Sequence, residues 1–381
     1  MTEPAADDVV RFAERVLFLL GRAATTTTYK YAVLLGLVDV CIEQVAEDGA
    51  APDVITTRQL AEKVTWLYFR HAERFAEGRV LRQNRRGQAR ILQEIVSYRE
   101  ARGMPGWHRA RREDPEGFAR LVDEVEWYLI RNPLPRLQLV GGRSIDLLYR
   151  IGWGPEETSE APRRSDVRAY QRGEASAFDN RILLFPGVGE ALVRLAGILR
   201  PVVERQWASM VARINDLPEA DLERFLFAPA RETAAAVRGP LWDLQEGRCF
   251  YCGGDLRRRT CQIDHFIPFA RHPDDGIANL VLAHGRCNGA KRDFLAARRH
   301  VERWRMRTWD AGGRPTKALA YVAREAGREL DLDLAPATLA TARAIYLHLP
   351  PGIHLWRGPS RDAFEVFEED HREAFARVLV S

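Results

Sequence analysis

Two pairs of metal-ligand residues constrain this chain of 381 residues more than any other feature of its sequence. Two residues separate Cys249 from Cys252, two also separate His284 from Cys287, and 31 residues lie between the pairs. Zn²⁺ prefers thiolate and imidazole ligands, and a two-residue gap lets both members of a pair bind one ion from a tight turn. Gly253 suits the left-handed backbone that such a turn often needs. The sequence therefore predicts a structural zinc site made of these two pairs.

The use of cysteine and the apolar runs predict a cytoplasmic protein. Four of the five cysteines fall between positions 249 and 287, which favours metal binding in a reducing compartment over a disulfide framework. The first ten residues, MTEPAADDVV, are acidic and lack the features of a secretory signal. The longest apolar run, YAVLLGLVDVCI, contains Asp39 and is too short to span a bilayer, so no membrane association is expected.

Hydrophobic periodicity and capping residues predict a mainly α fold with small β elements. The stretch TTRQLAEKVTWLYFRHAERF is expected to begin a helix at Thr56, and RILLF is expected to be a strand. The stretch PRLQLVGGRSIDLLYRIGW predicts two short strands around a Gly-Gly turn. A long helix is expected in GEALVRLAGILRPVVERQWASMVARIN, where Pro201 predicts a kink or a break.

A strongly basic stretch lies in the N-terminal half. Residues 70–112 contain twelve arginines and four glutamates. Such an imbalance indicates a surface that neutralises phosphate groups. A solvated helix face with some ion pairs along the helix explains the same composition, and the sequence does not decide between the two.

The residues between the metal-ligand pairs are those of an active site. Asp264 and His265 follow RTCQI, which alternates like a strand, and Pro268 ends the run. Adjacent strand residues face opposite sides, so both serve one site only if the strand ends or twists there. A lone histidine is more often a structural residue than a base. Asp264 and His265 occur here together with Asn279 and Asn288, which favours a catalytic role.

The ordered motifs CFYC, DHFIP, NLVLAH, RCN and AK carry a resemblance to a known family. From Cys249 to about Phe294 the chain resembles the HNH endonuclease module, a ββα-metal nuclease with a pair of zinc knuckles. The resemblance covers a small part of the chain. It implies a helical N-terminal region joined to a ββα-metal module that hydrolyses phosphodiester bonds in DNA, most readily in double-stranded DNA.

The resemblance also implies a role for each motif residue. His265 matches the general base that activates water. Asp264 matches a ligand of the catalytic cation, for which a carboxylate favours Mg²⁺ or Mn²⁺. Asn279 matches the residue that braces the loop and orients the His265 ring. Asn288 falls on the third letter of the motif, where many members have a second metal-ligating histidine.

Two residues depart from the family pattern. Asn288 makes the module an HNN variant, and its amide oxygen is a weaker ligand than imidazole for a transition metal, which leaves the preferred metal open. His284 replaces the usual cysteine and gives a Cys₃His set that Zn²⁺ still accepts. The alternative is that His284 belongs to the active site and the zinc site is degenerate.

A basic helix is expected to follow the second pair. It begins near Asn288 and continues through NGAKRDFLAARRHVERWRMRTW. In the family this helix lies along the nucleic acid, which implies phosphate contacts by Lys291, Arg292, Arg298 and Arg299. A solvated basic helix without such contacts is the alternative.

The sequence predicts four segments in the chain. Residues 1–155 form a mainly helical domain for recognition of DNA or a partner, and 156–230 a linker loop, a strand and a long helix. The nuclease module occupies 231–310, and 311–381 form a C-terminal helical segment that packs back. The layout resembles restriction or phage-defence nucleases, and cutting both strands with one metal centre per chain would need a homodimer or sequential nicks. The alternative is a non-catalytic, zinc-stapled nucleic-acid-binding protein.

Overall fold

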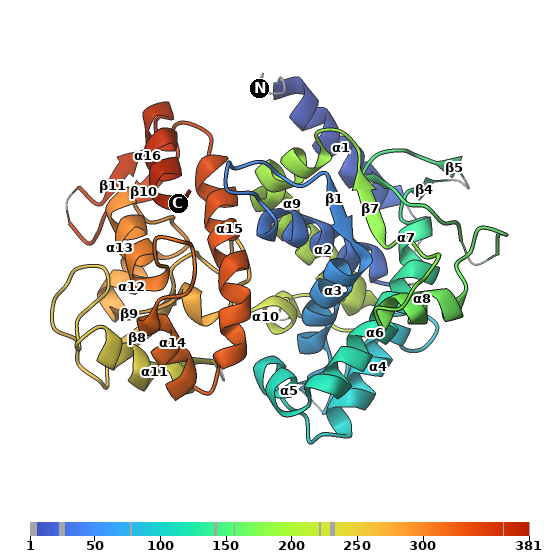
Figure 1. Ribbon diagram of the computed structural model, residues 1–381, viewed down its shortest axis with the longest axis horizontal. Coiled ribbons are helices and arrows are strands. Elements are labelled where there is room, and N and C mark those ends of the chain that lie inside the picture. The colour runs from blue at the N-terminus through green and yellow to red at the C-terminus, as the bar shows by residue number, and fades with distance from the viewer. Residues whose placement is uncertain are drawn as a thin grey trace. The chain divides into compact units, whose positions relative to one another are not determined.

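The computed structural model describes residues 6–22, 27–76, 78–140, 143–155, 157–220, 222–228, 233–360 and 362–380 (Figure 1). The chain divides into two compact units. Unit 1 comprises Met1–Cys41 and Pro52–Ala228, and unit 2 comprises Ile42–Ala51 and Pro229–Ser381. Helices dominate and the strands are short, which confirms the predicted mainly α fold with small β elements.

The described part of unit 1 is mainly helical, with one three-stranded sheet and two two-stranded sheets. Its helices are α1 Ala6–Arg22, α2 Tyr29–Glu43, α3 Thr57–His71, α4 Arg90–Glu100, α5 Trp107–Glu113, α6 Pro115–Arg131, α7 Pro133–Arg136, α8 Arg164–Gln171, α9 Val188–Asn215 and α10 Leu222–Phe227. Its strands are β1 Val54–Thr56, β2 Arg74–Phe75, β3 Arg79–Val80, β4 Leu139–Val140, β5 Arg143–Ser144, β6 Tyr149–Arg150 and β7 Arg181–Leu184. The three-stranded sheet has the order β1-β7-β6 and is antiparallel throughout.

Three local predictions can be compared with unit 1. The start of α3 is confirmed, since Thr56 and Gln59 form a capping box in which Gln59 Oε1 accepts the Thr56 amide at 2.8 Å. The pairing of β4 with β5 confirms the two short strands, while the Gly-Gly turn at 141–142 lies outside the described residues. Of the kink or break predicted at Pro201, the break is wrong, because α9 continues through that residue with buried side chains on both sides of it, and the kink stays a prediction.

The core of unit 1 contains a cluster of rings around Trp207. Tyr68 and His71 of α3 lie 5.2 Å and 4.6 Å from it between ring centroids, both edge-on. All three side chains are fully buried. Burial lowers the pKa of His71 to about 3 from its ordinary value of 6.5, because a charged imidazole would lose its hydration there. His71 is therefore neutral in the folded protein.

Unit 2 combines a β-hairpin with helices. Its helices are α11 Thr233–Leu244, α12 Gly285–Lys291, α13 Arg298–Thr308, α14 Lys317–Glu325, α15 Ala335–Leu347 and α16 Glu369–Leu379, with 3₁₀ turns at Ile277–Asn279 and Glu329–Leu334. Its strands are β8 Cys261–His265, β9 Leu280–His284, β10 His354–Trp356 and β11 Phe364–Val366. The hairpin is β8-β9, and β10 pairs with β11. The C-terminal helices belong to the same compact unit as the hairpin.

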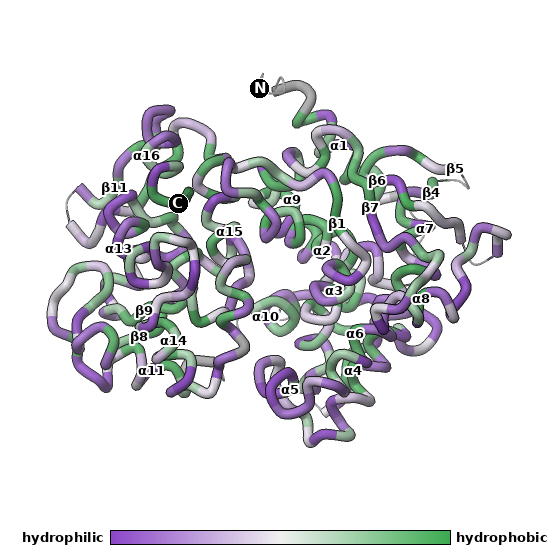
Figure 2. Tube along the Cα trace, in the orientation of Figure 1, coloured by the Kyte–Doolittle hydropathy of each residue, from purple (hydrophilic) through white to green (hydrophobic). Residues whose placement is uncertain are grey.

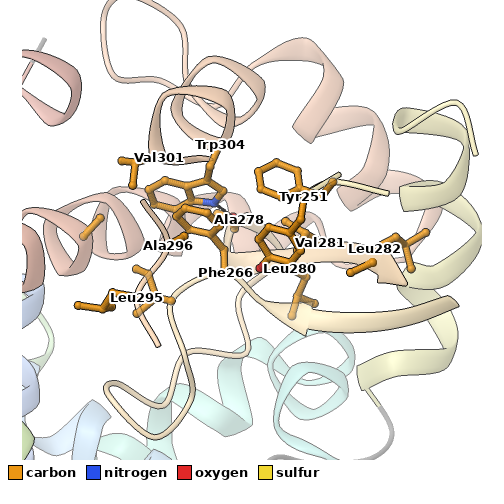
Figure 3. Packing of buried hydrophobic residues seen from close by; sticks show 14 of the residues in the cluster. Tyr251, Phe266, Ala278, Leu280, Val281, Leu282, Leu295, Ala296, Val301 and Trp304 are labelled. Carbon is orange, nitrogen blue, oxygen red and sulfur yellow. Dashed lines mark hydrogen bonds between the residues drawn. The ribbon is translucent and has the colours of Figure 1, made fainter. Parts of the chain in front are cut away.

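One hydrophobic core holds unit 2 together (Figure 3). Phe266, just after β8, stacks on Trp304 of α13 with 4.7 Å between ring centroids. Trp304 Nε1 also donates a hydrogen bond to the carbonyl oxygen of Ala278 at 2.8 Å. The ring stack thus joins the hairpin loop to α13, as the two adjacent rings in Figure 3 show.

The hydropathy of the helices follows their burial. Figure 2 shows α2 as mainly hydrophobic and α5 as mainly hydrophilic, in agreement with the buried side chains of α2 and the exposed ones of α5. In the part of the chain that the structure describes, no helix combines the length and the apolar character needed to cross a membrane.

The neutral state of His71 predicts a pH dependence of stability in unit 1. The unfolded chain binds a proton below pH 6.5, whereas the folded chain does so only near pH 3, so stability falls as the pH falls through this range. We expect a loss from this residue of up to about 1.4 kcal/mol per pH unit. Hydrogen exchange of the α3 amides between pH 7 and 5 measures it. The matched variant His71→Leu should show a shallower slope, and equal slopes would contradict the prediction.

Candidate metal centre and active site

The β8-β9 hairpin brings the second metal-ligand pair next to the first. The strands pair antiparallel, with Cys261 opposite His284 and His265 opposite Leu280. The first pair lies in a turn closed by the Gly253 amide, which donates to the Cys249 carbonyl at 2.9 Å. Gly253 has φ +70°, as the motif predicts, and the Phe250 amide donates to Leu282 of β9 at 2.9 Å. The turn is therefore fixed to the hairpin by backbone hydrogen bonds.

The four predicted zinc ligands form one cluster. The Sγ atoms of Cys249, Cys252 and Cys287 and one ring nitrogen of His284 all lie within 4.8 Å of one another. Neighbouring ligand atoms of a tetrahedral zinc–thiolate site lie about 3.8 Å apart, so the cluster fits one ion with little adjustment. The residues present thus fit a closed structural zinc site.

The orientation of His284 favours its role as a zinc ligand. Its Nδ1 lies 3.2 Å from Cys252 Sγ and 4.0 Å from Cys287 Sγ, while its Nε2 lies 2.9 Å from the carbonyl oxygen of Asp255. A hydrogen bond from Nε2–H to that carbonyl leaves Nδ1 as the lone-pair donor, which is the arrangement typical of metal-bound histidine. The alternative, that His284 belongs to the active site, finds no support in these contacts.

The cluster also perturbs its own thiols. Burial acts to raise the pKa of Cys252, but hydrogen bonds from the Gly254 backbone, His284 and the other thiols outweigh it and lower the pKa to about 7. Burial and the nearby Cys249 and Cys252 groups raise the pKa of Cys287 to about 12. Three thiolates in so small a volume repel one another, and a bound dication would remove that repulsion.

Asp264 is held by two buried side chains. Tyr251 donates its hydroxyl proton to Asp264 Oδ2, and Lys291 Nζ lies 3.1 Å from the same oxygen. Lys291 Nζ also donates to the carbonyl oxygen of His265 at 2.9 Å. Among the described residues nothing hydrogen-bonds to Asp264 Oδ1, and the Asp264 side chain is 9% exposed. The environment raises the pKa of Tyr251 well above its ordinary value, with burial as the largest cause and Asp264 as the next.

The structure places Lys291 differently from the sequence-based expectation. The predicted continuous helix from Asn288 is wrong, because α12 ends at Lys291 and α13 begins only at Arg298. Lys291 is fully buried, and burial lowers its pKa although Asp264 acts in the opposite direction. Its predicted phosphate contact stays a prediction, since the contacts seen are with Asp264 and His265.

His265 is the last residue of β8, so the strand ends at the position that the sequence predicts. Its Nε2 lies 2.8 Å from Asp275 Oδ1, and its ring lies against Phe269 with 5.3 Å between centroids. Among the described residues Nδ1 has no partner, so this nitrogen is free to accept a proton. Arg328 donates to the carbonyl oxygen of Asp275 at 2.7 Å and fixes the backbone of the carboxylate.

Asn279 braces the loop between the two strands. Its Oδ1 accepts the Ile267 amide at 2.7 Å, and its Nδ2 donates to the carbonyl oxygens of Ile267 and Asp274 at 3.1 Å and 3.0 Å. Asn279 is fully buried, so these bonds satisfy its amide without water. Among the described residues no hydrogen bond joins the Asn279 side chain to the His265 ring, but Asn279 bonds on both sides of it, to the carbonyl next to Asp275 and, through its own carbonyl, to the Phe266 amide at 2.7 Å.

The remaining predicted residues lie on or beyond α12. Asn288 Nδ2 donates to Gln262 Oε1 at 2.9 Å, which leaves its Oδ1 unbonded. Arg292 is exposed at φ +49° and has no side-chain partner among the described residues. Arg298 pairs with Glu302 at 2.6 Å, and Arg299 donates to the Arg357 carbonyl. Arg292 is thus the one with an uncommitted guanidinium.

Sequence reasoning missed Asp275 and Tyr251. Asp275 belongs to the acidic pair in HPDDGIAN, four residues before Asn279, and Tyr251 lies inside the CFYC turn. Neither position has a spacing that indicates a role, and only the folded loop brings Asp275 to His265. Among the described residues no hydrogen bond joins the side chains of Asp264, His265, Asn279 and Asn288 directly to one another.

Comparison with known proteins gives one match. Residues 249–297 match the family model described as HNH endonuclease. The matched range contains the four zinc-ligand candidates, β8, β9 and α12. No curated protein and no solved structure matches the chain. The resemblance predicted from the motifs is confirmed, and the module is of the HNH nuclease type.

The zinc site is tested by removing one ligand. Cys252→Ser replaces a thiolate with a hydroxyl that binds Zn²⁺ poorly, so we expect the purified variant to contain no tightly held zinc, by inductively coupled plasma mass spectrometry. Cys261→Ser is the matched control, because Cys261 lies at the start of β8 outside the cluster. The wild type and this control should each hold one zinc ion per chain. Full zinc content in Cys252→Ser would contradict the assignment.

Proposed function

We propose, from the premise that residues 249–297 form a module of the HNH nuclease type, that this chain is a divalent-cation-dependent endonuclease acting on DNA. The observation that carries the proposal is the pair formed by His265 and Asp275, with Nε2 and Oδ1 2.8 Å apart. Because Nε2 bonds to Asp275, the other ring nitrogen of His265, Nδ1, has no partner among the described residues. The His265 side chain is partly exposed and lies at the end of β8, directly after Asp264. Zinc binding alone requires none of these groups.

His265 acts in this proposal as the general base. Its Nδ1 accepts a proton from the water that attacks the scissile phosphorus. Asp275 accepts the Nε2–H hydrogen bond, fixes that tautomer and stabilises the imidazolium that forms. Asn279 keeps the loop that carries Asp275 in place through its three hydrogen bonds. Proton acceptance therefore depends on the hairpin loop as well as on His265.

In this proposal Asp264 and Asn288 are the protein ligands of the catalytic cation. Their Oδ1 atoms are oxygen donors without a partner among the described residues, and they suit Mg²⁺ or Mn²⁺ better than Zn²⁺. When bound, such a cation supplies stabilisation of negative charge on the phosphate and the leaving 3′ oxygen. Lys291 and Tyr251 hold the Asp264 carboxylate in one orientation. Arg292, Arg298 and Arg299 remain the proposed phosphate contacts at this site, and Arg292 is the one whose side chain has no partner among the described residues.

The wider role is inferred from the layout. A chain that combines a small nuclease module with a larger helical unit suits restriction or phage defence, in which unit 1 selects the target or restrains cleavage. Cleavage of both strands would then use two chains or two successive nicks. The alternative function, a non-catalytic nucleic-acid-binding protein, predicts zinc content and DNA binding without hydrolysis.

The nuclease proposal is tested by cleavage of supercoiled plasmid with Mg²⁺ or Mn²⁺. We expect nicking or linearisation by the wild type, and His265→Ala should lower the rate roughly 10²- to 10⁴-fold, the usual contribution of a general base. Zinc content and melting temperature of the variant serve as folding controls. His272→Ala is not a suitable control, because His272 is buried against Glu43. Cleavage by His265→Ala at the wild-type rate would contradict the assignment.

The role of Asp275 as a positioning residue gives a separate prediction. Asp275→Asn should lower kcat with little change in KM for DNA, by less than the roughly 10²- to 10⁴-fold contribution of the base itself. Asp275→Glu should recover part of the lost rate, because a carboxylate can again accept from Nε2. A merely structural residue would give neither the kcat-only effect nor this recovery. Equal kcat in the wild type and Asp275→Asn would refute the role.

A further inference from the structure

A loop in unit 1 displays arginines that have no acidic partner. Residues 82–88 connect β3 to α4 and contain Arg82, Arg85 and Arg86, all exposed. Arg213, near the end of α9, is exposed as well. The part of the chain that the structure describes provides no ion pair for any of these four side chains. The Arg82 guanidinium instead donates to the carbonyl oxygen of Ile214 at 2.6 Å, which joins the loop to α9.

Several other arginines of the basic stretch, residues 70–112, differ from those of the loop because they form ion pairs with acidic side chains. Arg74 pairs with Glu100, Arg90 with Glu94, and Arg102 with Asp114. Arg109 and Arg112 both pair with Glu113, at 2.7 Å and 3.3 Å. Much of the arginine excess in residues 70–112 is thus compensated locally, in line with the solvated-helix interpretation. The three arginines of the loop, like the exposed Arg79 of β3, have no ion pair among the described residues.

The backbone of the loop is rigidly anchored. Gln83 is fully buried, and its amide group accepts from Trp207 Nε1 at 2.7 Å and lies 3.2 Å from His71 Nδ1. Asn215 Oδ1 accepts the Arg82 amide at 2.8 Å, and Asn215 Nδ2 donates to the Arg82 carbonyl at 2.9 Å. Gln88 Oε1 accepts the Gln83 amide at 2.9 Å. Three buried or half-buried amide side chains therefore hold the loop, and little backbone ordering would accompany binding.

A pocket of about 290 Å³ lies between the loop and α9. Arg85 and Arg213 line it together with Met210 and Ile214. Two guanidinium groups are thus its polar side chains, and Met210 and Ile214 are its apolar ones. Guanidinium groups present a fork of donors that matches phosphate oxygens. The described lining residues include no carboxylate, so a phosphate group there would face two guanidinium groups without a competing negative charge.

A buried lysine beside this surface responds to the same positive charge. Burial is the largest cause, and Arg213 the second, of a pKa of Lys30 lowered to about 8. Repulsion between cations is expected where no carboxylate intervenes. The lowered pKa of Lys30 therefore agrees with a positive potential at the end of α9, where Arg213 lies.

We propose that Arg82, Arg85, Arg86 and Arg213 form a phosphate-binding surface, here called the arginine surface, that holds the DNA backbone independently of sequence. The inference rests on the proposed function, because it takes the substrate of the nuclease module as the ligand. It assigns to unit 1 a second point of contact with the same DNA. Non-specific affinity would then come largely from unit 1, since each neutralised phosphate releases counterions.

The test compares two double variants in a His265→Ala background, in which cleavage is expected to be roughly 10²- to 10⁴-fold slower. Arg85→Ala/Arg213→Ala removes two cations from the arginine surface, and Arg109→Ala/Arg112→Ala removes two paired cations and changes the net charge equally. Binding of a fluorescent DNA duplex is measured by anisotropy over a series of salt concentrations, without added Mg²⁺ or Mn²⁺. The slope of log K against log salt should become shallower by about 1.8 in the first variant, for two lost phosphate contacts. The control should keep the wild-type slope.

The outcomes separate this inference from the nuclease proposal. Equal slopes for the two double variants, with matched zinc content and melting temperature, would overturn the arginine surface, and plasmid cleavage by the wild type would leave the nuclease standing. A shallower slope in the first variant alone supports the surface even if the wild type cuts no plasmid. Inorganic phosphate and a mononucleotide serve as competing probes. Loss of their binding in the first variant, with an unchanged DNA slope, would reassign the pocket to a small phosphorylated ligand and overturn the proposal.

Discussion

The convergence of Cys249, Cys252, His284 and Cys287 within 4.8 Å is the constraint on which the module depends. The segment between the two pairs contains only two five-residue strands and one turn of 3₁₀ helix, and two strands alone are marginally stable in water. A metal ion that joins both ends of this segment offsets the entropy of closing it. The hydrophobic core of unit 2 then covers the hairpin loop through Phe266 and Trp304.

The register of the β8-β9 hairpin fixes the position of His265 relative to the metal cluster. Because Cys261 lies opposite His284, His265 must lie opposite Leu280, about 13 Å along the strand from the metal cluster. The short helix α12 starts directly after His284 and ends at Lys291, whose ammonium group reaches Asp264 and the His265 carbonyl. Strand β8 and helix α12 thus both connect the metal cluster with the segment that contains Asp264 and His265. A shift of one residue in the register would turn Asp264 and His265 to the opposite faces of the hairpin.

The sequence predicted those parts of the site that depend on spacing and missed those that depend on tertiary contacts. The zinc ligands, the strand ending at His265 and the start of α3 at Thr56 follow from local patterns, and the structure places them as expected. The end of α12 did not follow, because it depends on the left-handed conformation of Arg292, a residue with no local signal for it. Asp275 reaches His265 in a loop held by tertiary hydrogen bonds from Asn279, Arg328 and Thr338, which no local pattern predicts. The continuity of α9 through Pro201 likewise reflects packing that outweighs a local preference.

The module contains two kinds of positive charge, buried ones paired with a carboxylate, such as Lys291, and exposed ones without such a partner among the described residues, such as Arg292. Removing one partner of a buried ion pair costs roughly 3–5 kcal/mol, because the other charge stays behind without compensation. Lys291 would meet such a cost if it left Asp264 to contact a phosphate, whereas Arg292 next to it is exposed and would meet none. The same distinction separates the paired arginines of residues 70–112 from Arg85 and Arg86. In both units, therefore, the cations best able to bind a phosphate are those that the fold leaves without a carboxylate.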